Sequence, residues 1–134
     1  MNRTHLEGAA EKLTAQRGYT FYTGPEDDMG HTVRNYPAAW LAPPELHAVE
    51  GRTHGRATYD MTLHLLRPGA RISPAERRTA LAEMEAQMIE IFAELSLDER
   101  ILAVEGLSVR PRSFSLTPHG EISQTATARI VAWF

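Results

Sequence analysis

Alternation of apolar and polar side chains over residues 57–65 constrains the fold more than any other feature of the chain. One set of alternate positions is apolar, and the other is mostly polar: Ala57, Tyr59, Met61, Leu63 and Leu65 against Thr58, Asp60, Thr62 and His64. Successive strand side chains point to opposite faces of a sheet, so the pattern predicts a strand with one buried and one wetter face. The strand runs to Arg67, where Pro68 and Gly69 stop it. Its buried face needs an apolar layer to cover it.

A long helix supplies that layer. Its start is marked by Ser73 as cap, Pro74 at the first helical position and Glu76 three residues after the cap. An apolar stripe then recurs at helical spacing, made of Leu81, Met84, Met88, Ile91, Phe92 and Leu95. We expect this stripe to pack on the apolar face of residues 57–65, together with Trp40 and the apolar side of the last strand.

The first third of the chain predicts a helix, two strands and a connector. Thr4 and Glu7 form a capping box for a helix that extends to Arg17 and ends at Gly18. Tyr19–Tyr22 and Tyr36–Ala42 are the two strands, with Pro37 at the first residue of the second. The polar connector Leu46–Arg56 is able to extend into a hairpin arm ahead of the long strand.

The C-terminal third predicts further strands. A second Ser-x-x-Glu, Ser96 to Glu99, is able to start one more helical turn, and residues 100–111 follow as a strand interrupted at Gly106 and Pro111. Residues 112–134 form a hairpin that turns at Thr117–Gly120, and its last strand places apolar residues on one side: Ile122, Ala126, Ala128, Ile130 and Ala132.

The order helix, strands, helix, strands predicts an α+β fold. We expect an antiparallel or mixed sheet with two helices packed on one face, plus a projecting hairpin or loop. At 134 residues, the chain predicts a single domain over residues 1–134.

Composition excludes several classes of function. The absence of cysteine removes disulfides, thiolate metal sites and a cysteine nucleophile, and a net charge of -3 argues against a broad basic surface for nucleic acid. No apolar run reaches the roughly 20 residues of a membrane-spanning helix, and residues 1–13 lack the apolar centre of a secretory signal. We therefore expect a cytoplasmic protein with no membrane partner. Lys12 is the only lysine; the arginine bias favours a protein interface, although a GC-rich genome also produces it.

The titratable side chains of the sequence favour structural roles over chemical ones. The histidines include no pair at the i, i+4 spacing of helical metal ligands, and for His64 hydrogen bonding at the surface or across strands is expected. The residues Glu26, Asp27, Asp28 and His31 could hold a hard cation, but they lack the spacing of a calcium loop, which favours a solvated turn or a contact with a neighbouring subunit. A phosphate-binding glycine loop and a nucleophile elbow are both missing from the sequence. We expect no catalytic residue, cofactor or metal.

Residues 21–45 followed by residues 57–69 resemble the tail terminator proteins of long-tailed bacteriophages and related prophages. The best local match is Tyr36-Pro37-Ala38, supported by Thr58–Pro68 and by the chain-ending strand of residues 128–134. The resemblance spans nearly the whole chain and includes the order of helices and strands. Related head-tail joining proteins are similar too.

The resemblance implies a structural virion protein that is not an enzyme. Such a protein forms a homo-oligomeric ring, a hexamer, on the last ring of the tail tube protein, where it stops polymerisation and presents the surface for a head completion protein. DNA can pass through the ring without sequence-specific recognition. The implied location is the virion, and the host bacterial cytoplasm during assembly. The candidate contacts with subunits or tube are Glu26, Asp27, Asp28, His31, Glu50, Arg52, Arg56, Arg110 and Arg112.

Two alternatives stay open at this point. The chain could be a small ferredoxin-like enzyme or ligand-binding protein with a pocket between sheet and helices, lined by Trp40, Tyr59 and His64, because element order alone permits it. It could also be another joining component of the same head-tail assembly. A filled interior favours the structural role, and an enclosed pocket containing His64 favours the enzyme.

Overall fold

Strand β4 (Gly55–Arg67) organises the sheet in the computed structural model, which describes residues 3–134. It pairs along its length with β6 (Ile122–Trp133), while its other edge is shared by β2 (Ala38–Leu41) and β3 (Glu45–Gly51). The six-stranded sheet has the order β1-β2-β4-β6-β5, with β3 on β4 outside this path. Among residues 3–134, only β1 (Thr20–Thr23) and β2 pair in parallel; β5 (Ile101–Pro111) is antiparallel to β6. The α+β class is confirmed.

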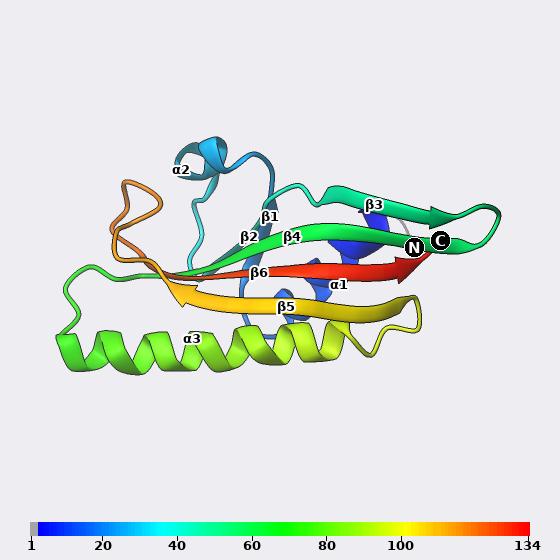
Figure 1. The fold of residues 1–134 in the computed structure, drawn as a ribbon. Helices are drawn as coiled ribbons and strands as arrows, with labels where there is room; N and C mark the ends of the chain where they lie inside the picture. Colours follow the sequence, from blue (N-terminus) through cyan, green and yellow to red (C-terminus); the bar gives the residue numbers. More distant parts are fainter. Residues whose placement is uncertain (1–2) are drawn as a thin grey trace.

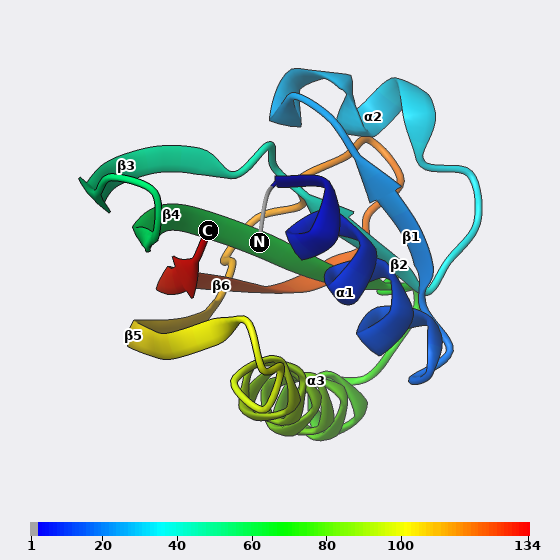
Figure 2. The same ribbon diagram turned by 90° about the vertical axis from the view of Figure 1, so that its right-hand side faces the viewer.

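Helices α1 (Arg3–Ala15) and α3 (Pro74–Leu95) cover the same face of the curved sheet (Figures 1 and 2). The predicted capping box begins α3: Ser73 Oγ accepts from the Glu76 amide at 3.1 Å, and Glu76 Oε1 accepts from the Ser73 amide at 3.4 Å. Most of its predicted stripe is buried against the alternate apolar residues of β4 and β6, and its buried members are Met84, Met88, Ile91, Phe92 and Leu95. The strand alternation and the helical stripe therefore meet as predicted.

The opposite face is covered at one end only. The 3-10 helix η1 (Glu26–Asp28) and the short helix α2 (Met29–Thr32) lie over it, beside the loop of residues 112–121 (Figure 1). A second apolar cluster fills the space beneath them: Met29, Val33, Ala38, Trp40 and Leu66. The prediction that Trp40 packs under α3 is wrong. Its indole faces the other side, where Nε1 donates to the Gly24 carbonyl at 3.0 Å.

Three other local predictions are wrong. Thr4 lies inside α1, which starts at Arg3, so it does not cap the helix. Ser96 is the C-cap of α3 and caps no further helix; its hydroxyl donates to the Ala93 carbonyl at 2.5 Å, and residues 96–100 follow as hydrogen-bonded turns. The predicted strand before Thr117 is a loop, because buried Glu121 accepts from the amides of Leu116 and Thr117 at 2.6 and 2.8 Å. Those amides are then not available for a sheet ladder.

The connector before β4 forms the predicted hairpin arm, which is residues 45–56. Strand β3 runs back along β4 and projects past the helices (Figure 1). At its tip, Gly51 has a φ of 107°, and a Cβ on Gly55 would lie 2.0 Å from the Glu50 carbonyl oxygen, so both positions need glycine. Gly106 (φ 62°) does not break β5; it sits in a bulge where the register with β6 shifts. Within residues 3–134 there is no helix that is long and apolar enough to cross a membrane.

Phe92 tests the role of the α3 stripe. Its side chain is buried in the main core, so Phe92→Ala should lower the free energy of unfolding by about 3–5 kcal/mol in urea titrations. Ile89 on the same helix is half exposed, so Ile89→Ala should change the free energy of unfolding by less than about 1 kcal/mol. Equal effects of the two substitutions would show that α3 does not bury the assigned face.

Candidate subunit interface

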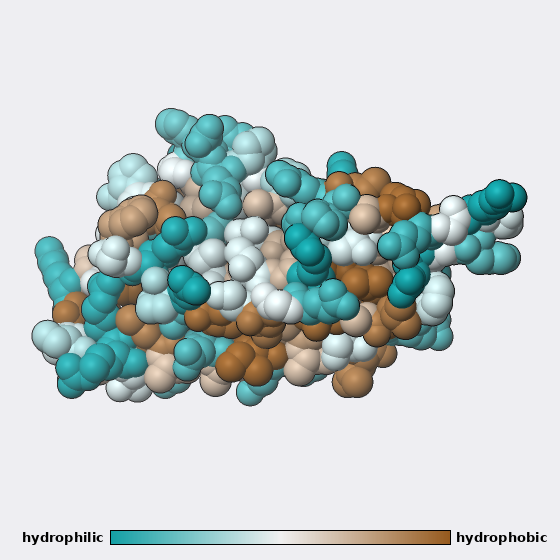
Figure 3. Space-filling model, in the orientation of Figure 1, coloured by the Kyte–Doolittle hydropathy of each residue, from teal (hydrophilic) through white to brown (hydrophobic). Residues whose placement is uncertain are grey.

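The outer face is the side of the sheet turned away from α1 and α3. Pairing places the residues in phase with Asp60, Thr62 and His64 on this side, opposite Arg129, Thr127 and Thr125 of β6. This is the wetter face that the alternation predicts, and it divides into a covered end and an open end. Polar side chains dominate the open centre of the molecule in Figure 3.

A hydrogen-bond chain holds the covered end together. His64 is fully buried, with Nε2 3.0 Å from Glu26 Oε1 of η1 and Nδ1 2.7 Å from Thr125 Oγ1 of β6. Arg112 Nε donates to the same Thr125 oxygen at 3.1 Å. These hydrogen bonds thus join η1, β4, β6 and the loop after β5.

The protonation pattern follows from Glu26. An ionised carboxylate only accepts, so Nε2 of His64 carries the proton, and a neutral imidazole then leaves Nδ1 to accept from the Thr125 hydroxyl. Burial favours that neutral state, because it lowers the pKa of His64 from its ordinary value of 6.5, against the opposing effect of Glu26. Each member of the chain therefore has a defined donor or acceptor role.

The order hydroxyl, imidazole, carboxylate also occurs in nucleophilic hydrolases. Here Arg112 already donates to the Thr125 oxygen, and His64 is sealed from solvent. A substrate carbonyl would have to displace the guanidinium to reach that oxygen. The hydrogen-bond chain through His64 therefore has a structural role, which is to attach η1 to the sheet.

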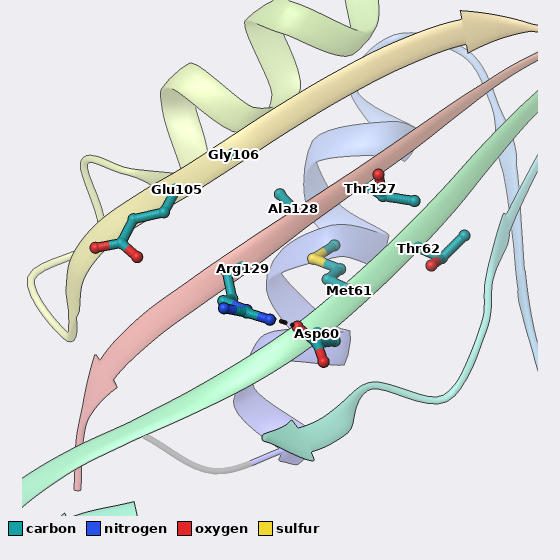
Figure 4. Close-up of a pocket in the computed structure, with 8 residues that line it drawn as sticks. All are labelled: Asp60, Met61, Thr62, Glu105, Gly106, Thr127, Ala128 and Arg129. Atoms are coloured by element: carbon teal, nitrogen blue, oxygen red, sulfur yellow. Dashed lines mark hydrogen bonds and ion pairs between the residues drawn. The ribbon is translucent and has the colours of Figure 1, made fainter. Parts of the chain in front are cut away.

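The open end is shallow and lined by paired charges (Figure 4). Arg129 Nε donates to Asp60 Oδ1 at 3.1 Å, and Thr62 and Thr127 lie beside this pair. Glu105 and the bulge at Gly106 border it on β5. Such a surface offers polar contacts over a broad area and encloses no small ligand.

The predicted contact residues fall into three groups. Glu26, Asp27, Asp28 and His31 lie on η1 and α2 above the covered end. Glu50, Arg52 and Arg56 lie on the hairpin arm, where Arg56 donates to Glu50 at 2.9 Å. Arg110 lies near the end of β5, and Arg112 is the first residue after it. The structure brings the first and third groups to opposite sides of His64 and leaves the arm apart (Figure 1).

Sequence reasoning missed two features of this surface. It expected hydrogen bonding for His64, and the cross-strand bond to Thr125 is present, but the partnership with Glu26 depends on the placement of η1. It also missed that Leu46 and Val49 of the arm are half exposed. The two are three residues apart, so a regular strand would point them to opposite faces, and the register shift between Leu46 and Ala48 that brings both to one side has no local signal in the sequence.

The residues proposed for an enzyme pocket do not converge. Tyr59 faces the helices, whereas Trp40 and His64 face the outer side, and an apolar cluster fills the space between sheet and helices. Among residues 3–134, no group of three or more His, Asp or Glu side chains is placed to hold a metal ion. Comparison of the chain with protein-family models and with curated proteins gave no match.

His64 gives the fold a specific pH dependence. Its lowered pKa means that the unfolded chain binds this proton more tightly, so the stability contributed by neutral His64 is present above about pH 6.5 and is lost as the pH falls through its folded pKa. We expect the wild type to lose stability on acidification from pH 7 to 5 more steeply than His64→Gln, measured by urea unfolding. Parallel pH profiles of the two proteins would contradict the buried neutral imidazole.

Proposed function

We propose that this chain is a structural subunit of the tail terminator type, which assembles into a homo-oligomeric ring and caps a bacteriophage or prophage tail tube. The feature that carries the proposal is the hairpin arm. It projects from a filled α+β body, and all seven residues of β3 are exposed. A projecting strand with a free edge is a ready site for pairing with another chain.

The arm combines an unpaired strand edge with apolar side chains. Within residues 3–134, β3 pairs only with β4, so its outer edge presents unpaired amide and carbonyl groups. Leu46 and Val49 are 51% and 54% exposed and pair with Tyr59 and Ala57, which places them on the helix side of the arm. Soluble monomers usually protect their free strand edges and rarely place exposed apolar side chains together beside such an edge.

Further exposed apolar side chains lie at the end of β6. Trp133 pairs with Arg56, which places it on the outer face, opposite to the face of Leu46 and Val49. Trp133 and Phe134 are 46% and 41% exposed, and the Phe134 amide donates to the Gly55 carbonyl at 3.1 Å. Figure 3 shows brown side chains around the base of the projecting hairpin, whereas its tip is hydrophilic. The base of the arm thus carries exposed apolar side chains on both faces, and buried apolar side chains form the core of a subunit interface.

A ring explains why the contact surfaces differ from one another. Closed rings form from head-to-tail contacts between two different patches of each subunit. The arm is one patch at one end of the molecule, and the polar outer face is another (Figure 1). A ring with unlike faces can accept the tail tube protein on one side and a head completion protein on the other, which stops further polymerisation.

Removing the apolar character of the arm tests this proposal. Leu46→Thr/Val49→Thr keeps strand-forming side chains, so the fold should persist by circular dichroism while rings disappear from negative-stain electron micrographs. Phe114→Ser is the matched control, because Phe114 is exposed on the loop of residues 112–121 away from the arm. Rings of unchanged size and yield in the Leu46/Val49 variant would contradict the proposed role of the arm.

A second experiment tests the capping step. The ring should bind one end of polymerised tube formed by the tail tube protein of the same phage or prophage, seen by electron microscopy, and should stop its elongation. Tubes that elongate equally with and without the protein would reject the tail terminator assignment.

A further inference from the structure

Two arginines at the end of β5 hold their guanidinium groups ready for an anion. Arg110 Nε donates to Ser108 Oγ at 3.2 Å, and Arg112 Nε donates to Thr125 Oγ1 at 3.1 Å. We call this surface the arginine shelf; its hollow of about 470 Å³ is lined by Ser108, Arg110, Pro111, Arg112, Thr125 and Thr127. In both arginines the hydroxyl partner engages Nε and leaves the terminal nitrogens for a ligand.

The shelf lacks a carboxylate of its own. Among residues 3–134, the ion pairs of arginine involve Arg17, Arg56, Arg67 and Arg129, and neither shelf arginine forms one. The neighbouring Arg129 is neutralised by Asp60 at 3.1 Å. A planar guanidinium matches a carboxylate at two points, so a pair of carboxylates is the ligand class that this geometry suits.

The same chain carries a matching pair. Asp27 and Asp28 are consecutive, exposed residues of η1, and in the described part of the chain neither forms an ion pair. Their backbone is fixed, because Glu26 bonds to His64 and the Asp28 amide donates to the Pro25 carbonyl at 3.0 Å. A rigid acidic turn loses little conformational entropy when it binds.

We propose that the arginine shelf of one subunit binds the Asp27–Asp28 turn of the next copy of this chain. The inference rests on the proposed self-assembly and adds a specific charged contact to it. Charge complementarity selects the occupant: both sets of charges are left unpaired within one subunit, and a second copy supplies each with its counterpart. Because shelf and turn are different surfaces, the contact is head-to-tail, as ring closure requires.

A charge swap tests the contact. Arg110 is used because Arg112 also supports the His64 chain. Asp27→Arg and Arg110→Glu, each alone, should raise the subunit concentration needed for half assembly by about tenfold or more, measured by mass photometry over a dilution series. The double variant Asp27→Arg/Arg110→Glu should restore it to within about threefold of the wild type, because the pair is re-formed with its charges exchanged.

The control is Arg78→Glu, which reverses an exposed charge on α3. Arg78 forms no ion pair within residues 3–134, so the substitution should leave assembly unchanged. If the wild type assembles but the double variant needs as high a concentration for half assembly as either single variant, the shelf contact is wrong and the ring proposal survives. A wild type that is monomeric at every concentration overturns both. If Arg110→Glu weakens binding of a single-stranded DNA oligonucleotide and leaves assembly intact, the shelf takes phosphate instead, and the proposed occupant is rejected.

Discussion

The unequal burial of strand β4 determines how the rest of the molecule is arranged. Residues 63–66 are buried on both faces, whereas residues 56–62 are fully buried only at the positions that face the helices. The doubly buried part is covered by α1 and α3 on one side and by η1, α2 and the loop of residues 112–121 on the other. A polar residue within it must be hydrogen-bonded to be tolerated. His64 meets that condition through Glu26 and Thr125, and the covering segment is thereby fastened to the sheet.

This arrangement separates a stable body from surfaces that are free to bind. The open end of the outer face and the hairpin arm contribute little to the core. Core packing therefore does not constrain their side chains, which are free to contact other chains. Fastening η1 through Glu26 also fixes the position of Asp27 and Asp28. The same hydrogen-bond chain orients Arg112, so one buried imidazole sets the geometry of both halves of the proposed contact.

Local signals in the sequence predicted the elements that depend on local chemistry. The start of α3 follows from Ser73, Pro74 and Glu76, and the strand of residues 57–67 follows from alternation, because both patterns report hydrogen bonding and burial within a few residues. Trp40 could not be assigned to a face, since all four residues of β2 are buried and a strand buried on both sides has no alternation. The Ser-x-x-Glu pattern at Ser96 wrongly predicted a helix start, because a serine in this position also occurs where a helix ends, as it does at the end of α3. The charged residues of the candidate interface were named with the family resemblance and stay predictions. Their grouping around His64 depends on contacts between residues 38 and 61 positions apart in the chain, which no local pattern reports.

The central claim is that the chain works as an assembly of copies of itself. Native mass spectrometry of the wild-type protein at micromolar concentration tests it most directly. The account predicts a closed particle whose mass is a multiple of the 15.0 kDa subunit, six copies under the tail terminator proposal. A mass of 15.0 kDa that persists as the concentration is raised would contradict it.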